Sequence, residues 1–273
     1  MTEHLYFAHA NSYPASVYHK MLGALAGDYT VAYTDRIGHD PHFPVTDCWP
    51  FLVDETIAAI ERLAVGPVWA VGHSLGGVLV AFGAVRRPEL FKGIVLLDSP
   101  LMSRQRALGI WLAKKVGFID RVTPGGNTLK RRDCWASVDM VHEYFARKPM
   151  FARFDPDCLW DYARHGTEDD GQGGRRLKFR PAIEHNIYVT LPHDIARYAD
   201  SNRVPGLYLA ASEQPVLGAR DLRYMHERFG LEVDRMPGSH LFPLERPLET
   251  ARRIRQAFRD IERQTACPTK EPA

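Results

Sequence analysis

Short unbroken apolar runs recur in the first and last thirds of the chain and alternate with stretches of helical spacing. Such runs, bounded by glycine, proline or polar residues, are typical of strands buried on both faces of a sheet. The predicted strands are residues 5–8, 29–33, 67–72, 92–97, 206–211 and 231–236. The predicted helices are residues 16–25, 51–63, 76–86, 219–229 and 248–263. This alternation predicts an α/β fold, a doubly wound and mostly parallel sheet of about six strands.

The alternation stops between residues 101 and 201. Helical spacing predicts helices there over residues 104–116, 138–145 and 158–164. This stretch contains no run that resembles a strand, and residues 166–174, which are polar and rich in glycine, are predicted to form a loop. We therefore expect residues 1–100 and 202–273 to form the core and residues 101–201 to form an inserted helical cap. The tail, residues 267–273, is expected to be loose.

Composition changes this interpretation little. The 273 residues are 45% apolar and 25% charged with a net charge of +2, so no nucleic-acid partner is expected. The four cysteines are far apart and form no CxxC pair, which indicates free thiols in a reducing compartment. No run approaches the roughly 20 apolar residues of a membrane span, and the first residues lack signal-peptide features. We expect a cytoplasmic protein without a membrane partner.

One pentapeptide carries a chemical signal. Gly72-His73-Ser74-Leu75-Gly76 matches G-x-S-x-G and lies between a predicted strand and a predicted helix. A serine in such a sharp turn presents its hydroxyl at the carboxyl edge of the sheet, and the crowded turn requires glycines around it. The motif therefore makes Ser74 the candidate nucleophile.

A serine nucleophile needs a base, and His240 directly follows the last predicted strand. The carboxyl ends of parallel strands meet at one edge of a sheet, so His240 is expected close to Ser74. His39 and His42 flank Asp40 in a loop broken by prolines, but no further ligand has a suitable spacing, so no metal is expected.

Several segments together resemble the α/β-hydrolase superfamily of serine hydrolases with a helical cap. Residues 9–14, His-Ala-Asn-Ser-Tyr-Pro, resemble its H-G-x-x oxyanion loop, residues 35–39 its D-x-x-G-x loop and residues 238–240 its histidine loop. The resemblance implies an oxyanion hole made by the backbone N–H groups of Asn11 and Leu75. The side-chain amide of Asn11 could also contact substrate, or Asn11 could simply be a turn residue.

Two features depart from that pattern. The first predicted strand starts within the first few residues, so the first two strands of the superfamily are expected to be missing. Ala10 replaces the usual glycine of the oxyanion loop, although alanine is small enough to keep the loop tight.

The acid that would orient His240 has three candidates. The usual place in the superfamily, after the strand before last, contains Glu213 and no aspartate. Another subset places the acid after the strand that follows the nucleophile helix, where Asp98 stands. We favour Asp98 over Glu213, and Asp221 below both, because a triad is recognised by geometry rather than by sequence position.

These residues predict a serine hydrolase that cleaves small or medium carboxylic esters through an acyl-enzyme, with no cofactor. The same residues also serve thioester cleavage, carbon–carbon bond hydrolysis or perhydrolysis, and a small-molecule receptor with slow turnover is the alternative of another class. Basic runs at residues 130–132 and 175–178 are interpreted as solvated surface or, alternatively, as contacts to an anionic substrate group.

Overall fold

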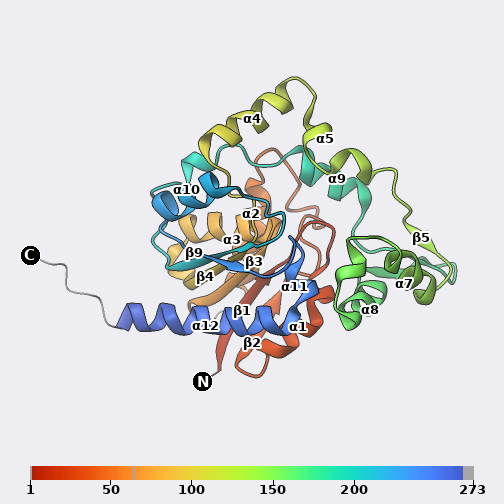
Figure 1. Ribbon diagram of the computed structural model, residues 1–273, viewed down its shortest axis with the longest axis horizontal. Helices are drawn as coiled ribbons and strands as arrows, with labels where there is room; N and C mark the ends of the chain where they lie inside the picture. Colours follow the sequence, from red (N-terminus) through yellow and green to blue (C-terminus); the bar gives the residue numbers. More distant parts are fainter. Residues whose placement is uncertain (1, 64, 267–273) are drawn as a thin grey trace, which may run out of the picture.

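The computed structural model describes residues 2–63 and 65–266, and the predicted loose tail lies outside them. Six strands form one parallel sheet in the order β2-β1-β3-β4-β8-β9 (Figure 1). They are β1 (Glu3–Ala8), β2 (Tyr29–Tyr33), β3 (Val68–His73), β4 (Phe91–Leu97), β8 (Gly206–Ala211) and β9 (Glu232–Met236). The predicted α/β class and the predicted six-stranded parallel sheet are confirmed.

Helices cover both faces of this sheet. One face packs against α1 (His19–Leu25) and α12 (Pro247–Ala266), and the other packs against α2 (Pro50–Glu61), α3 (Leu75–Arg86) and α10 (Ala219–Phe229). Successive strand residues alternate between the two apolar clusters, as the two-residue period of a strand requires: Leu5 and Phe7 face α1 and α12, whereas Tyr6 and Ala8 face α2 and α3. The central strands are therefore apolar over most of their length.

The segment between β4 and β8 wraps over one end of the sheet (Figure 1). Its helices are α4 (Arg104–Lys115), α5 (Ile119–Val122), α6 (Gly125–Thr128), α7 (Val138–Ala146), α8 (Pro156–His165) and α9 (Pro181–Val189). The three predicted helices correspond to α4, α7 and α8. The proposed boundaries of cap and core stay a prediction.

The predicted absence of strands from this segment was wrong. A three-stranded antiparallel sheet has the order β5-β7-β6, with β5 (Cys134–Trp135), β6 (Thr167–Asp169) and β7 (Arg175–Leu177). These strands are only two or three residues long and carry charged residues, so they show no apolar alternation. A cross-strand ion pair supports the hairpin instead, because Arg176 lies 3.0 Å from Glu168.

The segment predicted as a loop, residues 166–174, accordingly contributes β6 and the turn that follows it. The Asp170 carboxylate closes that turn by accepting the backbone N–H groups of Gln172 and Gly174, both at 2.8 Å. Among residues 2–63 and 65–266, none of the helices combines the length and apolar character that crossing a bilayer requires.

Candidate active site

Ser74 occupies a strained turn between β3 and α3. Its φ of 52° and ψ of −113° are unusual for a residue other than glycine, and such strain concentrates at functional sites. A Cβ on Gly72 would lie 2.4 Å from the carbonyl oxygen of Gly76, and a Cβ on Gly76 would lie 2.1 Å from that of Ala8. The crowding predicted for this turn is thus confirmed, and it explains why both positions are glycine.

His240 lies between Ser74 and Asp98. Its Nε2 is 3.1 Å from Ser74 Oγ, and its Nδ1 is 2.8 Å from Asp98 Oδ2. A carboxylate can only accept, so Nδ1–H donates to Asp98 and Nε2 is left to accept the serine proton. The Asp98 side chain is fully buried, whereas 31% of the His240 side chain is exposed. The geometry is that of a nucleophile, a base and an orienting acid.

The other two acid candidates lie elsewhere. Glu213 is half-exposed and pairs with Arg153 at 2.8 Å. Asp221 accepts the backbone N–H and the hydroxyl of Ser103, at 2.9 and 2.7 Å. Of the three candidates, the structure brings Asp98 to the imidazole.

The loop after β8, where the superfamily usually carries its acid, donates a hydrogen bond to Asp98 in this structure. It supplies donors to Asp98: the N–H of Ala211 donates to Oδ1 and the N–H of Val216 donates to Oδ2, each at 3.1 Å. Backbone donors favour the ionised form of a carboxylate and fix its orientation. The end of β8 and the loop after it therefore hold the Asp98 carboxylate in place.

A second histidine, which the sequence analysis did not single out, fixes the backbone at His240. His73 Nε2 lies 2.9 Å from the carbonyl oxygen of His240, and its Nδ1 lies 2.7 Å from the Tyr18 hydroxyl. Burial lowers the pKa of His73 well below its usual range, so the ring is neutral. Nε2–H must then donate to the carbonyl and Nδ1 must accept from Tyr18. The sequence signal that could have drawn attention to His73 is its position in the motif, directly before Ser74.

The candidate oxyanion loop is tied to this turn. The N–H of Gly76 donates to the carbonyl oxygen of His9 at 3.1 Å. The buried His9 ring bonds to Ala10 O at 2.8 Å through Nδ1 and accepts the N–H of Ile37 at 2.9 Å through Nε2. Burial lowers the pKa of His9 to about 4, so this ring is also neutral at pH 7. Its bonds hold the loop on which Asn11 stands.

The two predicted oxyanion donors differ in their surroundings. Leu75 is the first residue of α3, where backbone N–H groups lack partners within the helix and carry partial positive charge. The side chain of Asn11 is already engaged, because its Nδ2 donates to the carbonyl oxygen of Glu184 in α9 at 3.1 Å. That contact joins the loop to the segment 101–201.

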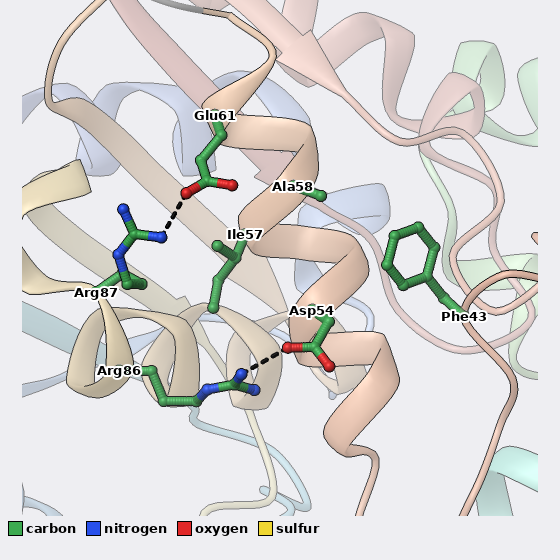
Figure 2. A pocket seen from close by; sticks show the side chains of 7 residues that line it. All are labelled: Phe43, Asp54, Ile57, Ala58, Glu61, Arg86 and Arg87. Carbon is green, nitrogen blue, oxygen red and sulfur yellow. Dashed lines mark hydrogen bonds and ion pairs between the residues drawn. The ribbon is translucent and has the colours of Figure 1, made fainter.

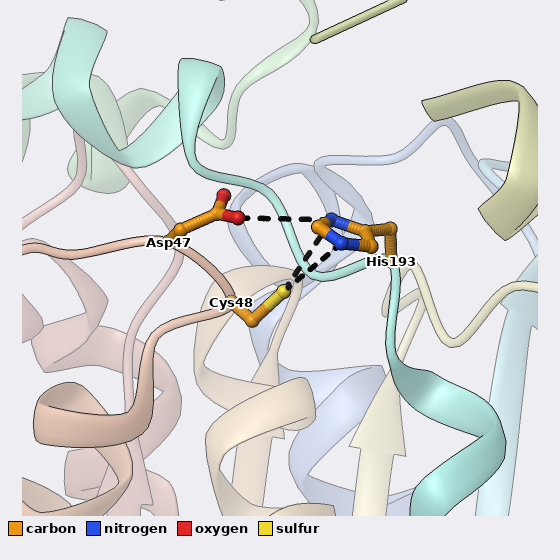
Figure 3. Close-up of side chains that lie close together, drawn as sticks. All are labelled: Asp47, Cys48 and His193. Carbon is orange, nitrogen blue, oxygen red and sulfur yellow. Dashed lines mark hydrogen bonds and ion pairs between the residues drawn. The ribbon is translucent and has the colours of Figure 1, made fainter. Parts of the chain in front are cut away.

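Another cluster combines Asp47, Cys48 and His193, whose potential ligand atoms lie within 4.8 Å of one another (Figure 3). Sequence reasoning missed it because Cys48 and His193 are 145 positions apart. Lys114 pairs with Asp47, and its Nζ lies 3.1 Å from His193 Nδ1, so a cation of the chain already neutralises the carboxylate. His39 and His42 are not part of this cluster and contact Arg180 and Asp40 instead.

A surface groove of about 410 Å³ lies between α2 and α3, where Arg86 pairs with Asp54 and Arg87 with Glu61 (Figure 2). Both arginines stand at or just beyond the end of α3 opposite to Ser74, roughly 18 Å along the helix at about 1.5 Å per residue. The groove is therefore separate from the candidate triad.

Comparisons with known proteins agree with the fold. The sequence profile of the Alpha/beta hydrolase family matches residues 5–253, and the chain belongs to that family. It is 31% identical over 100 residues to a protein of Oryza sativa subsp. japonica named as a probable esterase, covering 34% of this chain and 36% of that protein. The chain thus spans about a third of the length of that relative.

A longer match, 25% identical over 227 residues, is to the Abhydrolase domain-containing protein AFT2-1 of Alternaria alternata. It covers 68% of this chain and 80% of that protein. Among solved structures, E-2-(acetamidomethylene)succinate hydrolase superposes with a TM-score of 0.76 at 22% identity, over 95% of this chain and 91% of that one. The family match and the esterase-like relative support a hydrolase function for this chain.

Proposed function

We propose that this protein is a serine esterase that hydrolyses a carboxylic ester through an acyl-enzyme on Ser74. The observation that carries the proposal is the continuous chain of hydrogen bonds from Ser74 Oγ through His240 to the buried Asp98. A buried carboxylate that fixes the imidazole leaves Nε2 free to accept a proton, which is what a serine needs to become a nucleophile.

In the first half of the reaction, Ser74 Oγ bonds to the ester carbonyl carbon while His240 Nε2 takes the hydroxyl proton. The carbonyl oxygen becomes an oxyanion, which the N–H groups of Leu75 and Asn11 stabilise. One such donor lowers the activation barrier by about 2.7–4 kcal/mol. The bond to the alcohol oxygen then breaks, and His240 returns the proton to that oxygen. In the second half, a water oxygen bonds to the acyl carbonyl carbon while His240 Nε2 takes a proton from that water. The bond between the acyl carbon and Ser74 Oγ then breaks, His240 returns the proton to Oγ, and the carboxylic acid is released.

A fluorophosphonate probe tests the nucleophile directly. Peptide mass spectrometry should locate the adduct on Ser74, and Ser74→Ala should remain unlabelled. Ser201→Ala, which removes an exposed serine outside the proposed site, is the matched control and should label like the parent protein. Labelling of another serine in the parent protein, with Ser74 unmodified, would refute the proposal.

Turnover separates the enzyme from the alternatives. With 4-nitrophenyl acetate, an esterase releases many equivalents of 4-nitrophenol per protein, whereas a receptor with slow turnover gives a single stoichiometric burst. A panel that adds a thioester, a β-diketone and hydrogen peroxide with acetate covers the other bonds open to the same residues. An ester hydrolysed more slowly than these would contradict the ester assignment.

A further inference from the structure

Arg131 connects the segment 101–201 to the candidate oxyanion loop. It lies between α6 and β5, and its Nη1 donates to Ser12 Oγ at 2.8 Å. The same Nη1 forms an ion pair with Glu184 Oε2 at 2.7 Å. Ser12 directly follows Asn11, the candidate oxyanion donor, so this guanidinium stands beside the loop that faces Ser74.

The opposite edge of the guanidinium is unused. Nε and Nη2 are buried, yet among the described residues neither has a hydrogen-bond partner. The hydroxyl of Tyr162 lies close enough to Arg131 to affect the pKa of the guanidinium, although neither Nε nor Nη2 has a hydrogen-bond partner among the described residues. Buried donors without partners are rare because their lost hydration is not replaced, and such groups call for an explanation.

The geometry of this edge selects a kind of ligand. Nε–H and one Nη2–H project in parallel from a planar group, and this spacing matches the two oxygens of a carboxylate. Glu184, with only 6% of its side chain exposed, already lies against the guanidinium, so a dianion such as a phosphate monoester would meet strong repulsion. A monoanionic carboxylate fits the free edge better.

We propose that Arg131 determines the specificity of this hydrolase by binding a carboxylate group of the substrate through Nε and Nη2. The inference rests on the proposed function and extends it: the substrate is an ester that also carries a free carboxylate. Arg131 touches no reacting atom in this scheme and acts by positioning the ester carbonyl between Ser74 and the oxyanion donors.

Two substrates that differ in whether the carboxylate is free or capped as a methyl ester provide the kinetic test. Mono-4-nitrophenyl adipate has a free carboxylate, and methyl 4-nitrophenyl adipate has the same chain with that group capped. The quantity measured is the ratio of their kcat/KM values, free acid over capped. We expect the parent protein to favour the free acid and Arg131→Met to lower the ratio about 10- to 100-fold, as expected for loss of charged hydrogen bonds.

Two further variants calibrate that result. Lys130→Met removes the neighbouring exposed cation and should keep the ratio of the parent protein, which excludes a general effect of charge. Arg131→Lys keeps the charge but loses the pair of parallel N–H donors, so its ratio should lie between that of the parent protein and that of Arg131→Met. Equal losses on both substrates in Arg131→Met would overturn the proposal, because Arg131 would then only support the loop through Ser12.

Binding measured without turnover separates this inference from the proposed function. In Ser74→Ala, calorimetry with monomethyl adipate should give a Kd at least about tenfold lower than in Ser74→Ala/Arg131→Met. If that difference appears while the parent protein cleaves no ester, the esterase proposal fails and the carboxylate site stands. Tighter binding of phenyl phosphate than of monomethyl adipate, or no dependence on Arg131, would overturn the carboxylate site.

Removing Arg131 also leaves Glu184 as a buried carboxylate without its cation, which can destabilise the fold. Arg131→Met/Glu184→Gln removes both charges and avoids this. The double variant should melt close to the parent protein and still show the lowered ratio. A parent-like ratio in this folded variant would contradict the inference.

Discussion

The centre of the six-stranded sheet and the first helix of the segment 101–201 differ in how much of each is buried. Every residue of β3 is buried, and the strands beside it contribute to two continuous apolar clusters. In α4, by contrast, Ala107 is the one buried residue. The rest of the segment joins the core through apolar as well as ionic contacts. Phe151 and Tyr162 belong to the same apolar cluster as Phe7. Beside them, Arg36 lies 3.3 Å from Glu168, and Lys178 pairs with Asp35.

On the proposed function, the residues that carry out the reaction and the residue that selects the substrate lie in different regions. Ser74, Asp98 and His240 all follow or adjoin strands of the apolar sheet, where dense packing resists displacement. Arg131 and Glu184 belong to the segment 101–201, which also carries partly exposed ion pairs to the core at Arg36 and Lys178 that contribute little to stability. On the proposed function, the residues of the chemical steps therefore stand on the densely packed sheet, and the proposed carboxylate site stands on the segment 101–201.

The strongest test of the rigid part is Ser74→Ala. Alanine fits the same turn, so the free energy of unfolding should change by less than about 1 kcal/mol. Loss of the nucleophile should reduce kcat for ester hydrolysis by about 10⁴- to 10⁶-fold. Thermal melting and steady-state kinetics on one preparation check both, and full activity in the folded variant would exclude Ser74 as nucleophile.

Next in size is the acid. Asp98→Asn should lower kcat by up to about 10⁴-fold, because an amide cannot stabilise the imidazolium and favours the wrong tautomer. Glu213→Gln, the matched control, should lose less than about tenfold because Glu213 pairs with Arg153 on the surface. The opposite ranking would assign the acid to Glu213.

The buried histidine of the oxyanion loop should make stability depend on pH. His9 has a pKa of about 4 in the folded protein and about 6.5 in the unfolded chain. Between these pH values His9 is therefore protonated in the unfolded chain and neutral in the folded protein. Stability should therefore decrease as the pH is lowered through this window, by as much as about 1.4 kcal/mol per pH unit.

His39, also lowered to about 4, acts in the same direction, whereas Glu55, whose pKa burial raises to about 7, acts in the opposite one. His9→Gln keeps an acceptor near Ile37 and should flatten the dependence. Urea unfolding between about pH 7 and pH 4.5 measures the slope for both proteins. An unchanged slope in His9→Gln would show that His9 takes up its proton without unfolding.

The smallest effect is expected in the hairpin of β6 and β7. Glu168→Gln removes the partner of Arg36 and Arg176, both partly exposed, so global stability should change by less than about 1 kcal/mol. Local opening should become easier, and limited trypsin digestion should cut faster between residues 164 and 180. First cleavage within β3 or β4 would contradict the proposed contrast between the two regions.

The sequence was most informative where packing is apolar. The central strands were predictable because they fill two apolar faces, and the sharp turn at Ser74 was predictable because a Cβ does not fit at Gly72 or Gly76. Asp98 could be placed because an aspartate at the end of a strand beside the nucleophile strand reaches the same sheet edge, and β4 does pair with β3.

The remaining features depend on contacts between distant parts of the chain. The strands β6 and β7 are specified by pairing between charged residues rather than by apolar alternation. The supporting role of His73 needs Tyr18 on one side and His240 on the other, positions that no local pattern connects. Arg131 was visible in sequence only as part of a basic run, because its contacts with Ser12 and Glu184 exist only in the fold.

The position of the acid also determines how the chain can be divided. The N–H of Ser74 donates to the carbonyl oxygen of Leu97 at 3.0 Å, so nucleophile and acid are joined by a single rung of the sheet. His240 comes from the other end of the chain. Two fragments separated within residues 101–201 would therefore carry an incomplete site each, and esterase activity would return only on their reassembly. Such a pair would serve as a reporter of association between two proteins fused to the fragments.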